Sequence, residues 1–137
     1  MNFQLEVVSL KGNLFSGEVE KATLPGITGE FTVLARHMPI VAPLAVGEVL
    51  IKKTGETLSF SIGKGIFSFD GKVGRLLIED VSSAEEISEE KALEAKKKAE
   101  ELLAKGLKGE EKMQVVYQLR KSLVDLKIVR RKKRKTI

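Results

Sequence analysis

The chain has 137 residues, of which 42% are hydrophobic, with a single histidine and no cysteine. This length suits one domain, or a small domain with an appendage. The absence of cysteine excludes a disulfide framework, a thiolate metal site and a cysteine nucleophile, and a lone histidine excludes a multi-histidine metal site.

The net charge of +5 is unevenly distributed along the chain. Residues 1–81 carry eight basic and nine acidic side chains (net −1), and residues 82–111 carry six and nine (net −3). Residues 112–137 carry ten basic and one acidic side chains, a net charge of +9. This asymmetry predicts a basic arm at the C-terminal end.

Neither a secretory signal nor a membrane span is expected. No basic region followed by an apolar run occurs at the N-terminus. The longest apolar stretch, residues 38–51, contains two prolines, a glycine and Glu48, so it is too short and too interrupted to cross a bilayer. We therefore expect a soluble, intracellular protein.

The first 81 residues predict a β domain. Apolar and polar residues alternate in short segments such as 3–7, 58–62 and 73–77, which indicates strands with one buried and one solvated face. Turn signals such as Pro25-Gly26 and Asp70-Gly71 separate these segments. Eight to ten short strands with closely spaced turns favour a β-sandwich or a barrel.

The remaining residues predict two helices. No proline occurs from residue 82 onward, and the only glycines are Gly106 and Gly109. Ser83–Glu86 fits a capping box, and Ser88 is a second possible cap for the first helix. Gly106 is expected to end that helix, and a second helix is expected from about Glu111. The short connection between them predicts an antiparallel helical hairpin.

Both predicted helices have apolar residues at helical spacing. In the first helix these are Ala92, Ala95, Ala99, Leu102 and Leu103, and in the second they are Val116, Leu119, Leu123, Leu126 and Val129. Alanine buries little surface, and burial contributes only about 25 cal/mol per Å² of apolar area. We therefore expect a marginally stable hairpin that is able to open.

Three features suggest chemistry but have simpler structural explanations. His37 is the only histidine, and no nucleophile accompanies it in a recognisable pattern, so we expect an imidazole at a turn or an interface. Gly63-Lys64-Gly65 lacks the full phosphate-loop pattern and is expected to be a bulge or a tight turn. Glu30, beside Gly29, is expected to be an exposed loop carboxylate with a docking role. No catalytic residue and no enzymatic activity are predicted.

A run of six basic residues ends the second predicted helix: Arg130, Arg131, Lys132, Lys133, Arg134 and Lys135. Runs of this kind are usually solvated, and they are able to bind nucleic acid or anionic lipid without specificity. Because this run continues an amphipathic helix, its charges project from a structured arm. An acidic protein surface is therefore a competing target, and charge alone does not choose among these partners.

Several short motifs follow one another along almost the whole chain: Val7-Val8-Ser9, Phe15-Ser16-Gly17-Glu18-Val19, Gly29-Glu30-Phe31, His37-Met38-Pro39, Leu44…Gly47…Val49…Ile51 and residues 94–101. In this order they resemble the epsilon subunit of the F-type (rotary, proton-translocating) ATP synthase. The resemblance implies a ten-stranded β-sandwich over residues 1–83 that docks on the rotor. It also implies a mobile regulatory two-helix domain, with a basic tail, over residues 84–137.

The resemblance further implies a non-catalytic rotor subunit of the central stalk, which couples proton translocation to ATP synthesis and inhibits ATP hydrolysis through its mobile helices. The implied partners are the gamma subunit and the c-subunit ring for the sandwich, and the catalytic alpha and beta subunits for the basic arm. The complex is expected at the cytoplasmic face of the bacterial inner membrane, with this subunit peripheral. The implied contacts with gamma and the c ring are Ser9, Gly29, Glu30, His37 and Pro39.

Two departures from the family pattern are informative. Ala35-Arg36 replaces the usual Pro-Gly before the histidine, so this turn has to reach its geometry without glycine. At the family's regulatory ATP site, Ser88 and Lys91 replace an aspartate and an arginine, and Lys121 and Asp125 stand where ATP-binding members carry arginines. Lysine lacks the planar fork that binds phosphate oxygens in pairs, and aspartate repels them. We therefore expect no cofactor and weak or absent ATP binding, with Lys91 and Lys121 as the remaining candidate contacts.

The alternative is a free-standing nucleic-acid-binding module with a β domain and a basic helical arm. Such a module needs aromatic or basic side chains across its β face for stacking or for phosphate contact. Residues 1–81 have a net charge of −1 and contain neither tryptophan nor tyrosine, which favours the rotor subunit.

Overall fold

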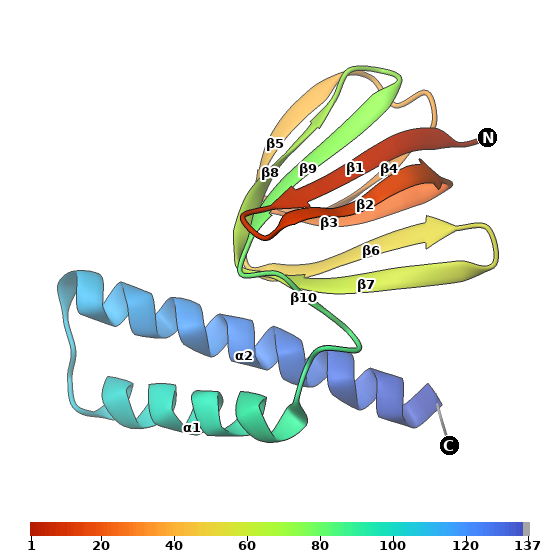
Figure 1. The fold of residues 1–137 in the computed structure, drawn as a ribbon. Coiled ribbons are helices and arrows are strands. Elements are labelled where there is room, and N and C mark those ends of the chain that lie inside the picture. The colour runs from red at the N-terminus through yellow and green to blue at the C-terminus, as the bar shows by residue number, and fades with distance from the viewer. Residues whose placement is uncertain (136–137) are drawn as a thin grey trace.

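The computed structural model describes residues 1–135, with Lys135 described by its backbone alone, and shows a β domain followed by two helices (Figure 1). The strands are β1 (Phe3–Ser9), β2 (Gly12–Val19), β3 (Lys21–Gly26), β4 (Gly29–Leu34), β5 (Ile40–Leu44), β6 (Gly47–Lys53), β7 (Glu56–Ile62), β8 (Lys64–Phe69), β9 (Val73–Glu79) and β10 (Ser82–Ser83). The helices are α1 (Glu89–Ala104) and α2 (Gly109–Lys135). The predictions of about ten strands and of two C-terminal helices are confirmed.

The strands form one strongly curled sheet that folds over into a sandwich. The order is β10-β7-β6-β3-β5-β8-β9-β1-β2. β4 lies outside this order and pairs with β3 along its whole length. β1 pairs in parallel with β9 and antiparallel with β2. The curl brings β2 into contact with β6, so the inner faces of the two layers enclose the core.

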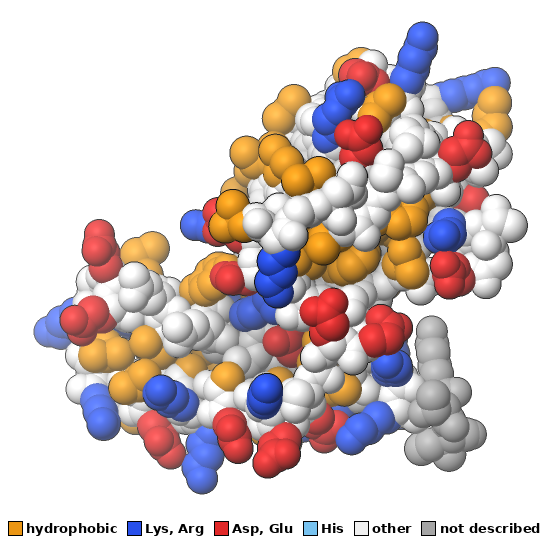
Figure 2. Space-filling view, in the orientation of Figure 1, with side chains coloured by type: hydrophobic (Ala, Val, Ile, Leu, Met, Phe, Trp, Pro, Cys, Tyr) orange, Lys and Arg blue, Asp and Glu red, His pale blue; other side chains and the backbone are white. Residues whose placement is uncertain are grey.

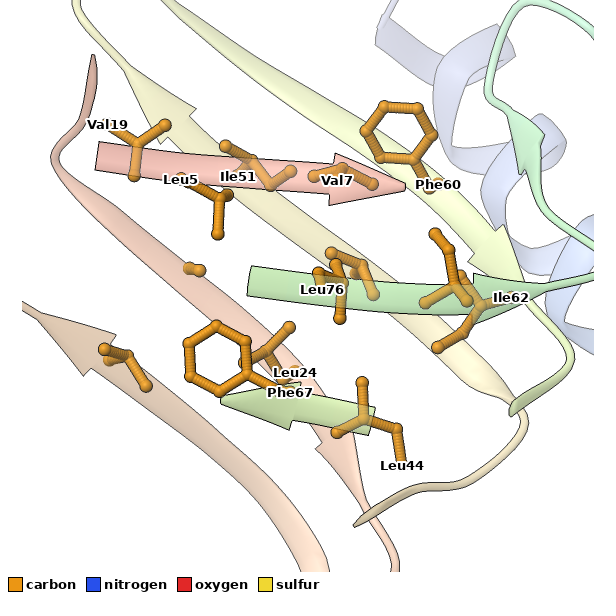
Figure 3. Close-up of a cluster of buried hydrophobic side chains, with 14 of the residues drawn as sticks. Leu5, Val7, Val19, Leu24, Leu44, Ile51, Phe60, Ile62, Phe67 and Leu76 are labelled. Atoms are coloured by element: carbon orange, nitrogen blue, oxygen red, sulfur yellow. The ribbon is translucent and has the colours of Figure 1, made fainter. Parts of the chain in front are cut away.

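The core lies between the two layers and is independent of the helices. Figure 3 shows Leu5, Leu24, Ile51, Phe67 and Leu76 pointing into this space, where all five are fully buried. A leucine or phenylalanine that is fully buried contributes about 1.5–3 kcal/mol to folding. Every member of this buried cluster lies between residues 3 and 81, so the sandwich does not need the helices to complete its core.

β7 departs from the expected pattern of one buried and one solvated face. Phe60 and Ile62 point into the core as predicted, but Ser61 on the opposite face is also fully buried. This face lies under α2, which contacts β6 and β7. The serines that the alternation placed in solvent therefore belong to the interface between the sandwich and the hairpin.

The second of the two predicted caps is the one that starts α1. Ser88 has extended backbone angles, and its Oγ accepts a hydrogen bond from the Lys91 backbone N–H at 3.3 Å. Ser83 instead belongs to β10, and its Oγ donates to a carboxylate oxygen of Glu86 at 3.0 Å. Gly106, with a φ of +81°, follows the end of α1 as predicted. α2 begins at residue 109, two positions before the expected start.

The helices form an antiparallel hairpin in which α2 lies between α1 and the sandwich (Figure 1). Ala92 and Ala99 of the predicted stripe are buried, whereas Ala95 is exposed. In α2 the predicted position Leu123 is 45% exposed, and Val115 and Ile128, outside the predicted stripe, are buried. α2 has neighbours on two sides, so its buried residues do not follow a single stripe.

Candidate functional site

The five implied contacts with gamma and the c ring do not form one cluster. Pairing across β1, β9, β8, β5 and β3 places Ser9 level with the tip of the β3–β4 hairpin, which carries Gly29 and Glu30. His37 and Pro39 lie at the other end of β5, in the loop that precedes it. The length of β5 separates the two groups by about 13 Å, at about 3.3 Å per residue.

The implied contact residues differ in exposure: Gly29, Glu30 and Pro39 are exposed, whereas Ser9 and His37 are half-buried. The Glu30 side chain makes no hydrogen bond or ion pair with the described residues, although its backbone pairs with Pro25 in the β3–β4 ladder. His37 is half-buried, and its Nδ1 donates to the Met38 carbonyl at 2.7 Å while its ring meets the edge of Phe69. Arg36 adopts a φ of +71°, which is how the turn before the histidine forms without the glycine of the family pattern.

A row of apolar side chains crosses the outer face of four neighbouring strands. Val8, Leu77, Ile66 and Pro43 are adjacent in register on β1, β9, β8 and β5. Leu77 is 56% exposed and Ile66 is 50% exposed, and Figure 2 shows hydrophobic side chains gathered on this part of the β domain. A contiguous exposed apolar surface is typical of a protein–protein contact. We call these four residues the apolar row; sequence reasoning missed it, because its members come from four separate strands.

A buried ion pair joins the hairpin to the sandwich. Glu48 on β6 is only 9% exposed at its side chain, and the Arg131 guanidinium of α2 binds both of its carboxylate oxygens, with Nη1 to Oε1 at 2.9 Å. The Ser59 hydroxyl donates to Oε2 at 2.6 Å. Burial raises the pKa of the Glu48 carboxyl, but the hydrogen bonds from Arg131 and Ser59 outweigh burial and hold that pKa below its usual value. The same pair raises the pKa of Arg131.

A second contact holds the middle of α2. The Tyr117 hydroxyl donates to a carboxylate oxygen of Asp80 at 2.6 Å, in the segment that leads from β9 to β10. Burial and the Asp80 carboxylate raise the pKa of Tyr117 well above its ordinary value. A side chain at Gly63 would collide with the Tyr117 hydroxyl, since an added Cβ would lie 1.7 Å from Oη. A cavity of about 1060 Å³ remains beside this contact, between the sandwich and the helices.

The predicted basic arm is partly paired within the molecule. Besides the bond from Arg131 to Glu48, Lys133 Nζ lies 2.7 Å from a carboxylate oxygen of Glu89, and Lys132 lies near Glu85. Hydrogen bonding to Lys133 lowers the pKa of Glu89. Arg130 and Arg134 are exposed, and the side chain of Lys135 lies outside the described residues.

The two candidate nucleotide contacts are not presented together. Lys121 lines the large cavity and is paired with Asp125 at 3.2 Å, with both side chains mostly buried. Lys91 is exposed and borders a separate cavity of about 240 Å³, which Ser88 and Asp125 also line. A phosphate group approaching Lys121 would have to compete with the Asp125 carboxylate. Across residues 1–135, no group of acidic or histidine side chains is arranged to hold a metal ion.

Comparison with known proteins shows which sequences the chain resembles. The family model for the β-sandwich domain of the ATP synthase delta/epsilon chain matches residues 2–84. ATP synthase epsilon chain 1 of Methylococcus capsulatus is 40% identical over 105 residues, which are 76% of this chain and 75% of that one. The ATP synthase epsilon chain of Caldicellulosiruptor bescii is 33% identical over 131 residues, 96% of each chain.

A solved structure shares the fold. A chain of the Euglena gracilis mitochondrial ATP synthase, solved as an OSCP/F1/c-ring assembly, superposes with a TM-score of 0.77 at 21% identity. The superposition covers 87% of this chain and 76% of that chain. No helix within the described part of the chain is both long and apolar enough to cross a membrane.

Proposed function

The chain belongs to the epsilon chains of the F-type ATP synthase, and we propose that it acts as a non-catalytic subunit of the central stalk, where it couples proton translocation to ATP synthesis and inhibits ATP hydrolysis. The observation that carries this proposal is the match to an epsilon chain over 96% of both chains, which includes the helices as well as the sandwich. The subunit would then lie peripherally at the cytoplasmic face of a bacterial inner membrane, held there by the complex.

Docking on the rotor is assigned to the sandwich. The apolar row offers a surface whose burial against the gamma subunit is favourable, at about 25 cal/mol per Å². Glu30 at the exposed hairpin tip offers a charge for the c-subunit ring. An independent core in residues 3–81 supports this division, because the sandwich is able to hold these surfaces whatever the position of the helices.

Inhibition is assigned to the helices and the basic arm. Residues 89–135 as one extended helix would reach about 70 Å, at about 1.5 Å per residue, which is enough to extend from the stalk into a catalytic head. The net charge of +9 on residues 112–137 supplies attraction to acidic surfaces of the catalytic alpha and beta subunits. The nucleic-acid alternative has no comparable support, since none of the aromatic side chains among residues 1–135 is exposed for stacking.

The test is made in the assembled complex. The untagged chain should co-purify with membrane ATPase activity, and deletion of the residues after Gly109 should raise ATP hydrolysis without abolishing synthesis. A chain that ends near Ser83 should still bind gamma. Unchanged hydrolysis after the deletion would remove the inhibitory role, and failure of the shortened chain to bind gamma would show that docking is not a property of the sandwich.

A further inference from the structure

The surface under α2 combines polar and apolar side chains: Leu50 lies beside the polar residues of β6 and β7, and α2 places the buried Ile128 on the same helical face as Tyr117 and Arg131. Glu48 and Ser59 lie on the outer face of β6 and β7, and Ser61 lies beside them with its hydroxyl buried and unpaired among the described residues. No residue of α2 belongs to the sandwich core. Removing α2 would therefore expose carboxylate and hydroxyl groups that water solvates well, together with Ile128 and Leu50, but it would open none of the sandwich core.

Among the arm residues, Arg131 has the most specific partner. Its guanidinium binds both oxygens of Glu48, an arrangement that lysine is unable to reproduce. The pairs of Lys132 and Lys133 involve lysine side chains that are 46% and 64% exposed. Exposed pairs of this kind contribute little, because water and salt screen them. Glu85 and Glu89 lie after the last strand, so of these three carboxylates only Glu48 attaches the arm to the sandwich.

We propose that Glu48 is an internal acidic binding site for the basic arm, and that it keeps the hairpin docked by competing for Arg131 with acidic surfaces of a partner. In the docked state Arg131 is occupied by the sandwich. Release of the hairpin frees Arg131 and its neighbours for an external carboxylate. The ratio of docked to released molecules then sets how often the arm is offered to a partner.

The docking contact stands by itself, but its regulatory consequence rests on the proposed inhibitory role of the arm. Tyr117 and Asp80 hold α2 at a second point, about two-thirds of the way from Arg131 to the start of the helix. Loss of Glu48 alone therefore leaves the contact between Tyr117 and Asp80 in place, and loss of both contacts should release the hairpin further.

The absence of cysteine from the natural chain makes the docked state measurable in the full-length protein. Ser61→Cys places a single thiol beneath α2, where its rate of labelling reports the released fraction. Val49→Cys places a single thiol in the core, where labelling reports unfolding of the sandwich itself. Docking and unfolding are thereby separated.

In the Ser61→Cys background, Glu48→Gln and Arg131→Gln should each raise the labelling rate by about ten- to a hundred-fold, as expected for the loss of a hydrogen-bonded charge pair. The variant that carries both changes should be labelled at about the same rate as either single variant. Two matched controls should change the rate less than about two-fold: Arg130→Gln removes the same charge one residue away, and Glu56→Gln removes a surface carboxylate of β7 that pairs with Lys53.

Equal rates for Arg131→Gln and Arg130→Gln would overturn the proposal, as would a rate for Glu48→Gln no higher than that for Glu56→Gln. If Glu48→Gln also accelerates labelling in the Val49→Cys background, the change unfolds the sandwich. The test then compares the labelling rate of Tyr117→Phe alone with that of Tyr117→Phe combined with Arg131→Gln, both in the Ser61→Cys background. The Arg131→Gln change should then add to the effect of Tyr117→Phe, and absence of any further increase would contradict the proposal.

ATP hydrolysis by the assembled complex distinguishes the two proposals. Glu48→Gln releases the arm and leaves its charges intact, so it should deepen inhibition relative to Glu56→Gln. If the thiol is exposed by Glu48→Gln but hydrolysis is unchanged, the docking contact stands and the inhibitory role fails. If hydrolysis rises on deletion after Gly109 but Glu48→Gln leaves the thiol protected, the inhibitory role stands and the internal site fails.

Discussion

Leu76 and Leu77 are neighbours in β9 that face opposite sides of the sandwich, and they provide a matched pair for testing the gamma contact. Leu76 is fully buried in the core, whereas Leu77 is 56% exposed in the apolar row. Replacing each by alanine removes the same atoms from the same strand. The two changes should therefore have different consequences, one for folding and the other for binding.

Leu76→Ala leaves a cavity in a packed core and should lower the free energy of unfolding by about 2–5 kcal/mol. Leu77→Ala should cost much less, because about half of that side chain is already in contact with water. If gamma covers the exposed half, the lost burial is about 0.75–1.5 kcal/mol, half of the value for a fully buried leucine. This loss weakens the affinity for gamma by about four- to twelve-fold.

Denaturant unfolding of the two variants, followed by titration of each folded variant with purified gamma subunit, measures both quantities. Gamma binding by Leu77→Ala at wild-type strength would refute the assignment of the apolar row. A loss of stability as large as that of Leu76→Ala would show that Leu77 is structural. Ile66→Ala on the adjacent strand should repeat the binding loss, since Ile66 and Leu77 are directly paired.

Three further outcomes are expected. Glu30→Lys should weaken ATP-driven proton pumping by the complex while it changes the unfolding free energy by less than about 0.5 kcal/mol, since the Glu30 side chain is exposed and has no partner among residues 1–135. Unfolding of the domain would contradict this. Calorimetric titration with ATP should show weak or absent binding, because the Lys121 ammonium is already paired with the Asp125 carboxylate. A dissociation constant in the low micromolar range would contradict this prediction. The Glu48 carboxyl, which faces Ser59, Arg131 and Lys127, has its pKa held below the ordinary 4.5, so its contribution to docking is fully present above that value and is lost as the pH falls through the lowered pKa. Small-angle scattering should show the wild type expanding towards the dimensions of Glu48→Gln over that acidic range, and an identical pH response of both proteins would contradict the role of Glu48.

The parts of the fold that were predictable from the sequence depend on local signals. Strand alternation and turn glycines are read within a few residues, and they predicted the number of strands and the hairpin. Ser88 was one of two predicted caps, and a cap is a local signal because it acts over three residues. The choice between Ser83 and Ser88 did not follow, because the pairing of Ser83 with Phe60 on β7 is a long-range contact.

The surfaces that the sequence did not reveal depend on such long-range contacts. Glu48 and Arg131 are 83 residues apart, and no local pattern marks either as the partner of the other. The burial of Ser61 results from a helix that begins almost fifty residues later in the chain. One signal was available in the sequence. Glu48 is the single charged residue in the apolar stretch 38–51, and a carboxylate in such a stretch needs a partner if it is buried.

The chemistry of the two surfaces matches the two tasks in the proposed function. Attachment to a rotor has to persist through every turn, and apolar burial suits that task because neither salt nor an acidic competitor weakens it. A helix that moves between two positions needs contacts that another partner is able to replace, and a carboxylate–guanidinium pair is replaceable by any other exposed carboxylate. Since two states are switchable when they differ by only a few kcal/mol, the contact between Glu48 and Arg131 under α2 is suited to release and the apolar row is suited to retention.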